Sequence, residues 1–515
     1  MPIDHIFVLM LENRSFDHML GLSGVTGTDA VTGKPTQING LSGTHSNSWD
    51  GVTCTAEAPA VDPMKKDPYH EFEDVLEQLC GHGAVYPPGG PYPAINNSGY
   101  LSNFIEKAGG SASPCDVMKS FAPPGSPGLT TPSLPVLTAL AKEFAVCDAW
   151  YSSMPGPTWP NRFFALGASS ACLDHSPSNL DIALWNVLEG FKFQHGSIFD
   201  VASGFLFWKR KLKWRIYAGN KLFTLAHALK GIHIWDIHRY SRFARHLMDP
   251  NYPAQFIWIE PNYGHVTSDY IGGNSQHPLD GITGGEALIK ATYCAIRNSP
   301  NWETSMLVIT WDEHGGFFDH AIPPRAVPPG DAPQFSGANK NGFAFDQYGP
   351  RVPAVIISPL IPANTIDHRP YDHASIPATL ERLFNLAPLT SRDRAANDLR
   401  SIASLPVARK VDPAVDSLCS KEEAALRAIP LDGLEAEPRP PTRSEEPIEL
   451  TPNLPGFLYL DAKTDAELPP ARVAPRIHVE SVQAQIGAIT NRRQAHDYFL
   501  AVRKKVIAAD SEVEA

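Results

Sequence analysis

The sequence predicts an α/β fold with a doubly wound, mostly parallel β-sheet between layers of helices. Short apolar, β-branched runs that suit buried strands alternate along the chain with segments whose apolar residues recur at helical spacing. Several of these runs end in polar residues, as expected at the carboxyl edge of such a sheet, where α/β proteins bind ligands. The chain has 515 residues, 43% of them hydrophobic, which is enough for one large core and an appendage.

The predicted elements follow one another in a regular order. Residues 6–11 are predicted to form the first buried strand, and a helix opens just after them. Residues 21–63 are rich in Gly, Thr, Ser and Asn and are predicted to be a long irregular segment that builds a wall of the site. Further helices are predicted over 71–80, 284–300 and 374–384, and further buried strands over 144–147, 256–259, 307–311 and 351–359.

The composition changes after about residue 393. Residues 429–475 hold many prolines and acids with little periodicity and are predicted to be an extended wrap or linker. Residues 490–509 have the pattern of an amphipathic terminal helix. We therefore predict a main domain over residues 1–395 and a peripheral C-terminal extension over residues 396–515 that packs against it.

Charge and hydropathy exclude several classes of protein. The net charge of −12 and the lack of a long Lys/Arg run argue against a nucleic-acid partner. No apolar stretch reaches the roughly 18 residues that a transmembrane helix needs. The densest basic cluster is interpreted as solvated surface, with a contact to anionic head groups or to another protein as the alternative. It consists of Lys209, Arg210, Lys211, Lys213 and Arg215.

The start of the chain and the cysteines bear on location. The first strand begins within a few residues of Met1, which leaves no room for a signal peptide. The sequence as it stands therefore predicts a cytoplasmic protein, or a secreted one if a leader was removed. None of the seven cysteines is in a Cys-x-x-Cys pair, so neither a zinc knuckle nor a disulfide scaffold is predicted. Cys147 and Cys294 have apolar neighbours and are predicted to be small core residues.

Four predicted strands lead to side chains that can take part in chemistry. They are Glu12 and Asn13 after the first strand, Asp312 and Glu313 after the strand at 307–311, Glu260 after the strand at 256–259, and a loop with Thr158 after the strand at 144–147. Taken singly, each has an ordinary explanation as a helix cap, a solvated turn, a buried ion pair or a turn residue. Four such strand ends together favour a site, and the carboxylate and amide oxygens suit a divalent cation.

Four longer motifs resemble one known family. They are Glu-Asn-Arg-Ser-Phe-Asp-His at 12–18, Pro-Gly-Pro-Thr-Trp-Pro-Asn-Arg at 155–162, Asp-Glu-His-Gly-Gly-Phe-Phe-Asp-His at 312–320 and Gly-Pro-Arg-Val-Pro at 349–353. In this order they resemble the phosphoesterase family of bacterial phospholipases C and acid phosphatases, which includes the plant non-specific phospholipases C. The resemblance spans residues 1 to about 390. It implies an alkaline-phosphatase-like fold and a metal-assisted attack on phosphorus by a hydroxyl side chain.

The resemblance also implies a cofactor and a nucleophile. Four residues match the family's metal-binding positions and imply one divalent metal ion: Glu12, Asn13, Asp312 and Glu313. Such oxygen ligands suit Ca²⁺, Mn²⁺ or Mg²⁺, and a hydroxyl ligand does not exclude Zn²⁺. Thr158 matches the nucleophile position, which implies a covalent phospho-threonine intermediate.

Histidines are the expected proton donors and phosphate-binding groups. His320 and His277 match catalytic histidines of the family, and His70 is a third candidate by position, in that order of preference. Three further residues are predicted to bind substrate: Asn161, Arg162 and Glu260. The first two can equally orient the loop that carries Thr158, and a structural ion pair is an equal alternative for Arg162.

The function implied by the resemblance is that of a phospholipase C, which cleaves the phosphodiester bond of phospholipid head groups. The alternative in the same fold is a broad-specificity acid phosphatase. A non-catalytic phosphate-binding protein is disfavoured because nucleophile, metal ligands and acid are all present. The predicted partners are a phospholipid or small phosphoester and, transiently, a membrane surface. The segment 190–250 matches no motif of the family, so the choice between phosphodiester and phosphomonoester substrates stays open.

Overall fold

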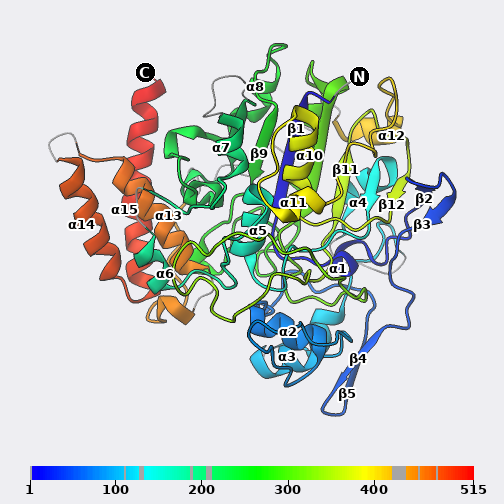
Figure 1. The fold of residues 1–515 in the computed structure, drawn as a ribbon, viewed down its shortest axis with the longest axis horizontal. Coiled ribbons are helices and arrows are strands. Elements are labelled where there is room, and N and C mark those ends of the chain that lie inside the picture. The colour runs from blue at the N-terminus through cyan, green and yellow to red at the C-terminus, as the bar shows by residue number, and fades with distance from the viewer. Residues whose placement is uncertain are drawn as a thin grey trace.

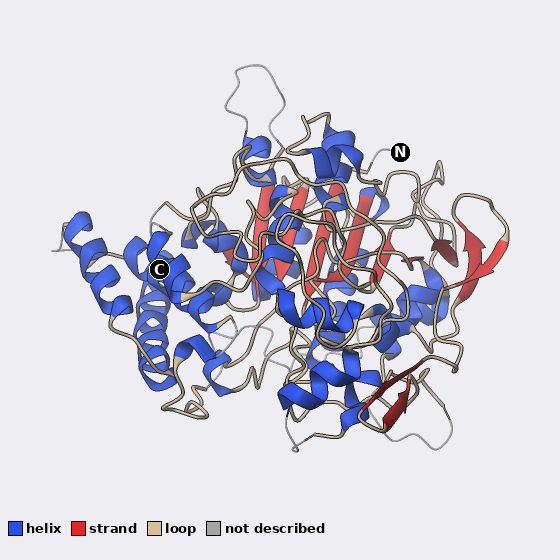
Figure 2. Cartoon of the chain, turned by 60° about the horizontal axis from the view of Figure 1, so that its bottom comes forward, coloured by secondary structure: helices blue, strands red, loops and turns tan. Residues whose placement is uncertain are grey.

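The computed structural model describes residues 3–108, 112–126, 133–185, 189–203, 212–419, 437–450, 453–470 and 474–514. A large sheet crosses the centre of the molecule with helices on both faces (Figures 1 and 2). From edge to edge its strands are β3 (Pro35–Gln37), β2 (Thr26–Asp29), β12 (Thr365–Asp367), β6 (Ala145–Cys147), β11 (Ala354–Ile357), β10 (Ser305–Trp311), β1 (His5–Leu11), β9 (Phe256–Glu260), β7 (Trp214–Ala218) and β8 (Ile237–Arg239). Most neighbours pair in parallel, while β11 runs against both β10 and β6. The predicted α/β fold is confirmed.

The helices follow the alternation that the sequence predicts. Helix α9 packs against both α4 and α8, and α5 packs against both α7 and α10. The bounds are α1 (Phe16–Leu20), α2 (Phe72–Cys80), α3 (Tyr100–Ala108), α4 (Pro135–Glu143), α5 (Thr158–Gly167), α6 (Asn179–Leu184), α7 (Ile198–Ser203), α8 (Phe243–Leu247), α9 (Thr283–Arg297), α10 (Ser375–Phe384), α11 (Ser391–Ala395), α12 (Pro413–Asp416), α13 (Leu454–Glu467), α14 (Pro475–Gly487) and α15 (Arg492–Glu514).

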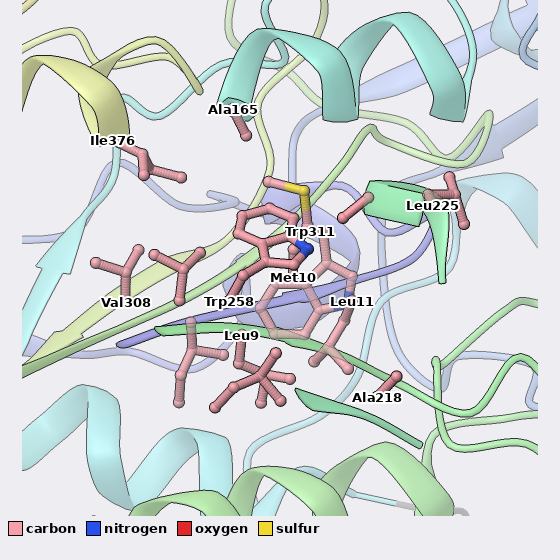
Figure 3. Close-up of a cluster of buried hydrophobic side chains, with 14 of the residues drawn as sticks. Leu9, Met10, Leu11, Ala165, Ala218, Leu225, Trp258, Val308, Trp311 and Ile376 are labelled. Atoms are coloured by element: carbon pink, nitrogen blue, oxygen red, sulfur yellow. The ribbon is translucent and has the colours of Figure 1, made fainter. Parts of the chain in front are cut away.

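The central strands are mostly apolar because helices cover both of their faces. Every residue of β1, β9 and β10 is buried. Figure 3 shows part of this core, with Trp258 and Trp311 close to Met10 and Leu11. The unbroken hydrophobic runs in the sequence therefore report strands that are buried on two sides.

The register of the central strands places the predicted metal ligands together. Leu11 of β1 pairs with Trp311 of β10, so the two strands end level. The residues that follow them therefore leave the sheet side by side at its carboxyl edge. Leu9 pairs with Ile259 of β9, which brings the end of a third strand to the same edge.

Residues 21–63 contain more regular structure than predicted. Strands β2 and β3 extend the main sheet next to β12, and β4 (Ser46–Trp49) and β5 (Val52–Thr55) form a separate hairpin. These strands are short, polar and largely exposed, so they lack the apolar pattern by which strands are recognised. The Asp50-Gly51 turn of the hairpin was an available signal, since both residues adopt positive φ.

The prediction of an extended wrap over residues 429–475 is wrong where the structure describes helix α13. This helix is buried along almost its whole length and packs against α14, α15 and the main domain. A helix covered on all sides has no polar face, so it lacks the amphipathic period that would reveal it. Figure 1 shows α13, α14 and α15 grouped at one end of the molecule. The predicted terminal helix is present as α15, from Arg492 onward.

One buried lysine ties α13 to the main domain. The Nζ of Lys463 donates to the backbone carbonyls of His227, Leu229 and Ile232 at 2.6–2.8 Å. Replacing it by Met should lower the free energy of unfolding by about 3 kcal/mol, because three buried acceptors lose their shared donor. Urea denaturation followed by tryptophan fluorescence measures this change. Lys504→Met, at an exposed position of α15, is the matched control, and equal stability of the two variants would contradict the assignment.

Two disulfides correct the expectation for the cysteines. Cys54 pairs with Cys115, and Cys294 pairs with Cys419, so Cys294 is not a free core residue. The partners are 61 and 125 residues apart, and no spacing pattern announces such pairs. Cys147 is free and buried, as predicted.

Two other expectations concern the surface and the membrane. Residues 209–211 of the basic cluster lie outside the described residues. No helix among the described residues is both long enough and apolar enough to cross a bilayer.

Candidate active site

The four predicted metal ligands lie together at the carboxyl ends of β1 and β10, and all are buried. The backbone N–H of Asn13 donates to Asp312 Oδ1 at 3.0 Å. Gly315 lets the chain pass close to Asn13, because a Cβ there would lie 2.1 Å from the Asn13 carbonyl oxygen. Burial raises the pKa of both Glu12 and Asp312, in spite of the opposing charge of Arg162 on Asp312 and of His277 on Glu12. The positive charges nearby therefore do not fully offset the cost of burying the charged carboxylates of Glu12 and Asp312.

The cluster has oxygen atoms to spare. Neither carboxylate oxygen of Glu12 accepts a hydrogen bond from the described residues, and the same holds for Glu313 Oε1. Buried carboxylate oxygens without partners are costly unless a cation binds them. Carboxylate and amide oxygens are the donors that a hard divalent cation prefers. The residues present therefore fit the divalent metal ion that the sequence predicts.

Among the described residues, two groups of His, Asp and Glu side chains bring their ligand atoms within 4.8 Å of one another. Glu12, Asp312 and Glu313 do not form such a group. Glu77, His82 and Glu106 form one, partly exposed at the surface. The other comprises Asp17, Asp319 and His320. Its two carboxylates already bind the Arg351 guanidinium, at 3.0 and 2.8 Å, which compensates one of their two negative charges without a metal.

Thr158 is the first residue of α5 and is buried beside the cluster. Its hydroxyl donates to Asn13 Oδ1 at 3.5 Å. The preceding loop holds Met154, Pro155, Gly156 and Pro157, and its prolines restrict the backbone. The hydroxyl is thus presented at the start of a helix, where the first-turn N–H groups favour an anion.

Asn161 and Arg162 use their polar atoms on the protein itself. The amide of Asn161 bonds to the backbone of Met154, Gly156 and Pro157, and so closes the loop before Thr158. Arg162 donates to Asp312 Oδ2 at 2.9 Å and to the Leu11 carbonyl at 2.9 Å. Both side chains are fully buried. Their contacts orient the nucleophile loop and a predicted metal ligand, which were the alternative roles considered for them.

Glu260, at the end of β9, is also fully paired. Its carboxylate accepts from the backbone N–H groups of Leu225 and Ala226, from the Trp258 indole and from the Tyr263 hydroxyl, at 2.7–2.9 Å. The side chain is buried. Four donors leave it as an anchor for the turn at 225–228 and for the loop after β9.

Two of the predicted histidines border the cluster. His70 Nε2 lies 3.3 Å from Asn13 Nδ2 and 3.6 Å from Glu313 Oε1. Burial opposes its charged form, but the carboxylates of Glu313 and Asp67 outweigh burial and raise the pKa of His70 to about 9. His277 Nε2 lies 3.5 Å from Asp67 Oδ2. The charges of Asp67 and Glu12 likewise overcome burial and raise the pKa of His277.

His320 belongs to a separate network. Its Nδ1 lies 2.7 Å from Asp17 Oδ2, and its Nε2 lies 3.1 Å from Asn39 Oδ1. Its ring stacks on that of His45, with centroids 4.5 Å apart. No hydrogen bond or ion pair among the described residues joins His320 to Thr158 or to the four predicted metal ligands.

Sequence reasoning missed two residues that support the site, Asp67 and Tyr270. The Asp67 carboxylate raises the pKa of both His70 and His277. Tyr270 stacks on His277 with ring centroids 3.7 Å apart. His373 Nε2 lies 2.6 Å from the Asp312 carbonyl oxygen. The signal for Asp67 was its position three residues before His70; Tyr270 lies in a loop without a motif.

A cavity of about 390 Å³ opens beside His70. Cavities of this size are typical of small-molecule sites. Asp67, His70 and Tyr270 line it from the main domain, and Lys65 and Lys66 lie at the same cavity. Residues of the C-terminal extension complete the lining: Arg443, Leu450 and Arg492.

A family model for the phosphoesterase family matches residues 3–387. The chain belongs to the phosphoesterase family. Non-specific phospholipase C6 of Arabidopsis thaliana is 35% identical over 426 residues, which cover 78% of this chain and 72% of the plant protein. Non-specific phospholipase C3 of the same plant is 33% identical over 422 residues, covering 78% and 73%. Phospholipase C B of Mycobacterium tuberculosis (strain H37Rv) is 27% identical over 436 residues, covering 78% and 77%.

As a member of the phosphoesterase family, the chain is a hydrolase that acts on phosphoester bonds. Among solved structures, a protein in the alkaline phosphatase superfamily from Vibrio parahaemolyticus has a TM-score of 0.29 at 15% identity, covering 52% of this chain and 65% of that chain. The family match ends at residue 387, so the C-terminal extension lies outside it.

Proposed function

We propose that the protein is a phospholipase C that hydrolyses the phosphodiester bond of phospholipids through a phospho-threonine intermediate. One observation carries the proposal: the Thr158 hydroxyl, at the start of a helix, contacts Asn13 beside buried carboxylate oxygens that accept no hydrogen bond from the described residues. Relatives named phospholipase C, at up to 35% identity in the comparisons reported above, support the substrate class.

In the proposed reaction, Thr158 Oγ1 gives up its proton and bonds to phosphorus, while the bond between phosphorus and the diacylglycerol oxygen breaks. That oxygen takes up a proton and leaves as the hydroxyl of diacylglycerol. Water then attacks the phospho-threonine and releases the phosphorylated head group. The N-terminal end of α5 favours the negative charge of the phosphoryl group. Glu12, Asn13, Asp312 and Glu313 would hold the divalent cation, which lowers the pKa of a nearby hydroxyl and neutralises phosphate charge when bound.

We assign the proton donor for the leaving oxygen to His70. This histidine lines the cavity, and its Nε2 lies 3.3 Å from Asn13 Nδ2 and 3.6 Å from Glu313 Oε1 at the border of the cluster. Asn161 and Arg162 are assigned to holding the nucleophile loop and Asp312, and Glu260 to anchoring the loop after β9. The predicted transient contact with a membrane surface remains a prediction.

A comparison of two chromogenic substrates tests the substrate class. We expect faster turnover of p-nitrophenyl phosphorylcholine, a diester, than of p-nitrophenyl phosphate, a monoester, together with release of diacylglycerol from phosphatidylcholine in mixed micelles. The reverse preference without diacylglycerol release would make the protein an acid phosphatase.

The leaving-group dependence of histidine variants tests the acid. An alkoxide needs a proton to leave, whereas p-nitrophenolate does not. His70→Ala should therefore slow phosphatidylcholine cleavage on the order of 10²-fold more than p-nitrophenyl phosphorylcholine cleavage. His82→Ala, at a partly exposed surface histidine, is the control.

Variants of His277 and His320 in the same assay decide among the three predicted histidines. An equal loss on both substrates for His70→Ala would move that residue to phosphate binding. A selective loss on phosphatidylcholine for His320→Ala would return the role of acid to His320.

A further inference from the structure

Residues of the C-terminal extension line the cavity beside His70. Arg443, Leu450 and Arg492 lie in the lining of the cavity that also contains His70 and Tyr270. The family match does not include these three residues.

Residues of the extension bind the loop that carries Tyr270. Asp269 and Tyr270 both have positive φ, 57° and 64°, which is uncommon for residues with a side chain. The loop folds back over Gly264, where a Cβ would lie 2.1 Å from the Tyr270 carbonyl oxygen. Such a backbone conformation persists only where surrounding contacts hold it.

Those contacts come from the extension. The Asp269 carboxylate accepts from Arg443 at 2.8 Å, from Arg492 at 3.1 Å and from the Thr442 hydroxyl at 2.9 Å. Glu446 binds both arginines in turn, at 3.3 and 3.0 Å. Arg492 is fully buried, so its ion pairs are shielded from solvent.

The backbone adds to these contacts. The Thr442 N–H donates to the Thr267 carbonyl at 3.0 Å, and the Ser268 hydroxyl donates to the Pro440 carbonyl at 2.8 Å. Three consecutive residues before Tyr270 are thus bound to the extension. The ring of Tyr270, in turn, lies at 13° to the ring of His277, which is paired with Asp67.

We propose that the C-terminal extension is part of the active site: Arg443 and Arg492, through Asp269, hold Tyr270 against His277 and fix one wall of the substrate cavity. Arg443, Arg492 and Asp269 are positioning residues in this scheme, since they act through Tyr270. The inference rests on the proposed function for its kinetic test alone.

The kinetic test compares neighbouring arginines of α15. Arg492→Gln should lower kcat/KM for p-nitrophenyl phosphorylcholine on the order of 10²-fold, because small displacements of positioned groups have effects of this size. Arg493→Gln is the control, since Arg493 is exposed and pairs only with Glu445 in the described residues. Arg492→Lys keeps the charge and should restore part of the loss. Metal content should be unchanged in all three variants.

A variant of Arg443 tests the inference even if the Arg492 variant fails to fold. It is half exposed, so Arg443→Gln should fold even if the Arg492 variant does not, and it should lower kcat/KM in the same direction. A double-mutant cycle between Asp269→Asn and Arg443→Gln should be non-additive, because both remove the same contact.

A structural readout separates this inference from the proposed function. In the wild-type protein the Tyr270 ring should shift the His277 ring protons upfield in NMR spectra of histidine-labelled protein, and Arg443→Gln should remove that shift. A wild-type protein without phosphodiesterase activity would overturn the function and leave this measurement intact. Unchanged His277 signals, or equal kcat/KM in the Arg443, Arg492 and Arg493 variants, would overturn the inference.

Discussion

Replacing Thr158 by Ala should lower kcat by at least about 10³-fold, with folding and metal content unchanged. The side chain is assigned the covalent bond to phosphorus, and no other hydroxyl of the site is placed at the start of α5. Removing one γ-oxygen and one methyl from a buried helix start should cost little stability. Steady-state kinetics with p-nitrophenyl phosphorylcholine measures the loss.

Two variants control this experiment. Thr158→Ser keeps a hydroxyl and should retain activity within about tenfold of the wild type. Thr138→Ala removes a buried threonine of α4, away from the cluster, and should leave kcat unchanged. If Thr158→Ala kept more than about a tenth of the wild-type rate, a metal-bound water would be the better nucleophile.

Replacing Glu12 by Gln should abolish metal binding and lower kcat by at least about 10³-fold. The stability of the metal-free protein should stay unchanged. Both oxygens of the Glu12 carboxylate are buried and accept no hydrogen bond from the described residues, so the substitution removes no hydrogen bond from the fold. Elemental analysis after dialysis, together with thermal unfolding of the metal-free protein, measures both effects.

Glu260→Gln provides the contrast at a neighbouring strand end. Its carboxylate accepts four hydrogen bonds, so the neutral amide should lower the free energy of unfolding by about 2 kcal/mol while metal content stays at the wild-type level. A fully active, metal-free preparation of the wild-type protein would contradict the metal assignment.

The central part of the fold and site could be predicted because two physical patterns coincide there. Strands β1 and β10 are buried on both faces, so they are recognisable in the sequence as apolar runs. The predicted metal ligands follow directly after these runs: Glu12, Asn13, Asp312 and Glu313. Parallel strands that end level bring these ends together. The motif around Thr158 added the proposed nucleophile, which composition alone would have left as a turn residue.

The rest of the site depends on contacts that sequence spacing does not encode. Asp67 meets His277 across more than two hundred residues, and Tyr270 reaches that ring from a loop with unusual backbone angles. Arg492 joins the same loop from the C-terminal extension. Helix α13 escaped prediction because it is buried on all sides. The ranking of the histidines changed because His320 lies in the Asp17–Arg351 network, whereas His70 borders the cluster.

The stereochemistry at phosphorus shows whether hydrolysis passes through a covalent phospho-threonine intermediate. A phosphorothioate diester of known configuration would be hydrolysed in ¹⁸O-labelled water and the configuration of the product determined. Attack by Thr158 followed by attack of water inverts phosphorus twice, so the account predicts net retention. Net inversion would mean a single direct attack by water and would contradict it.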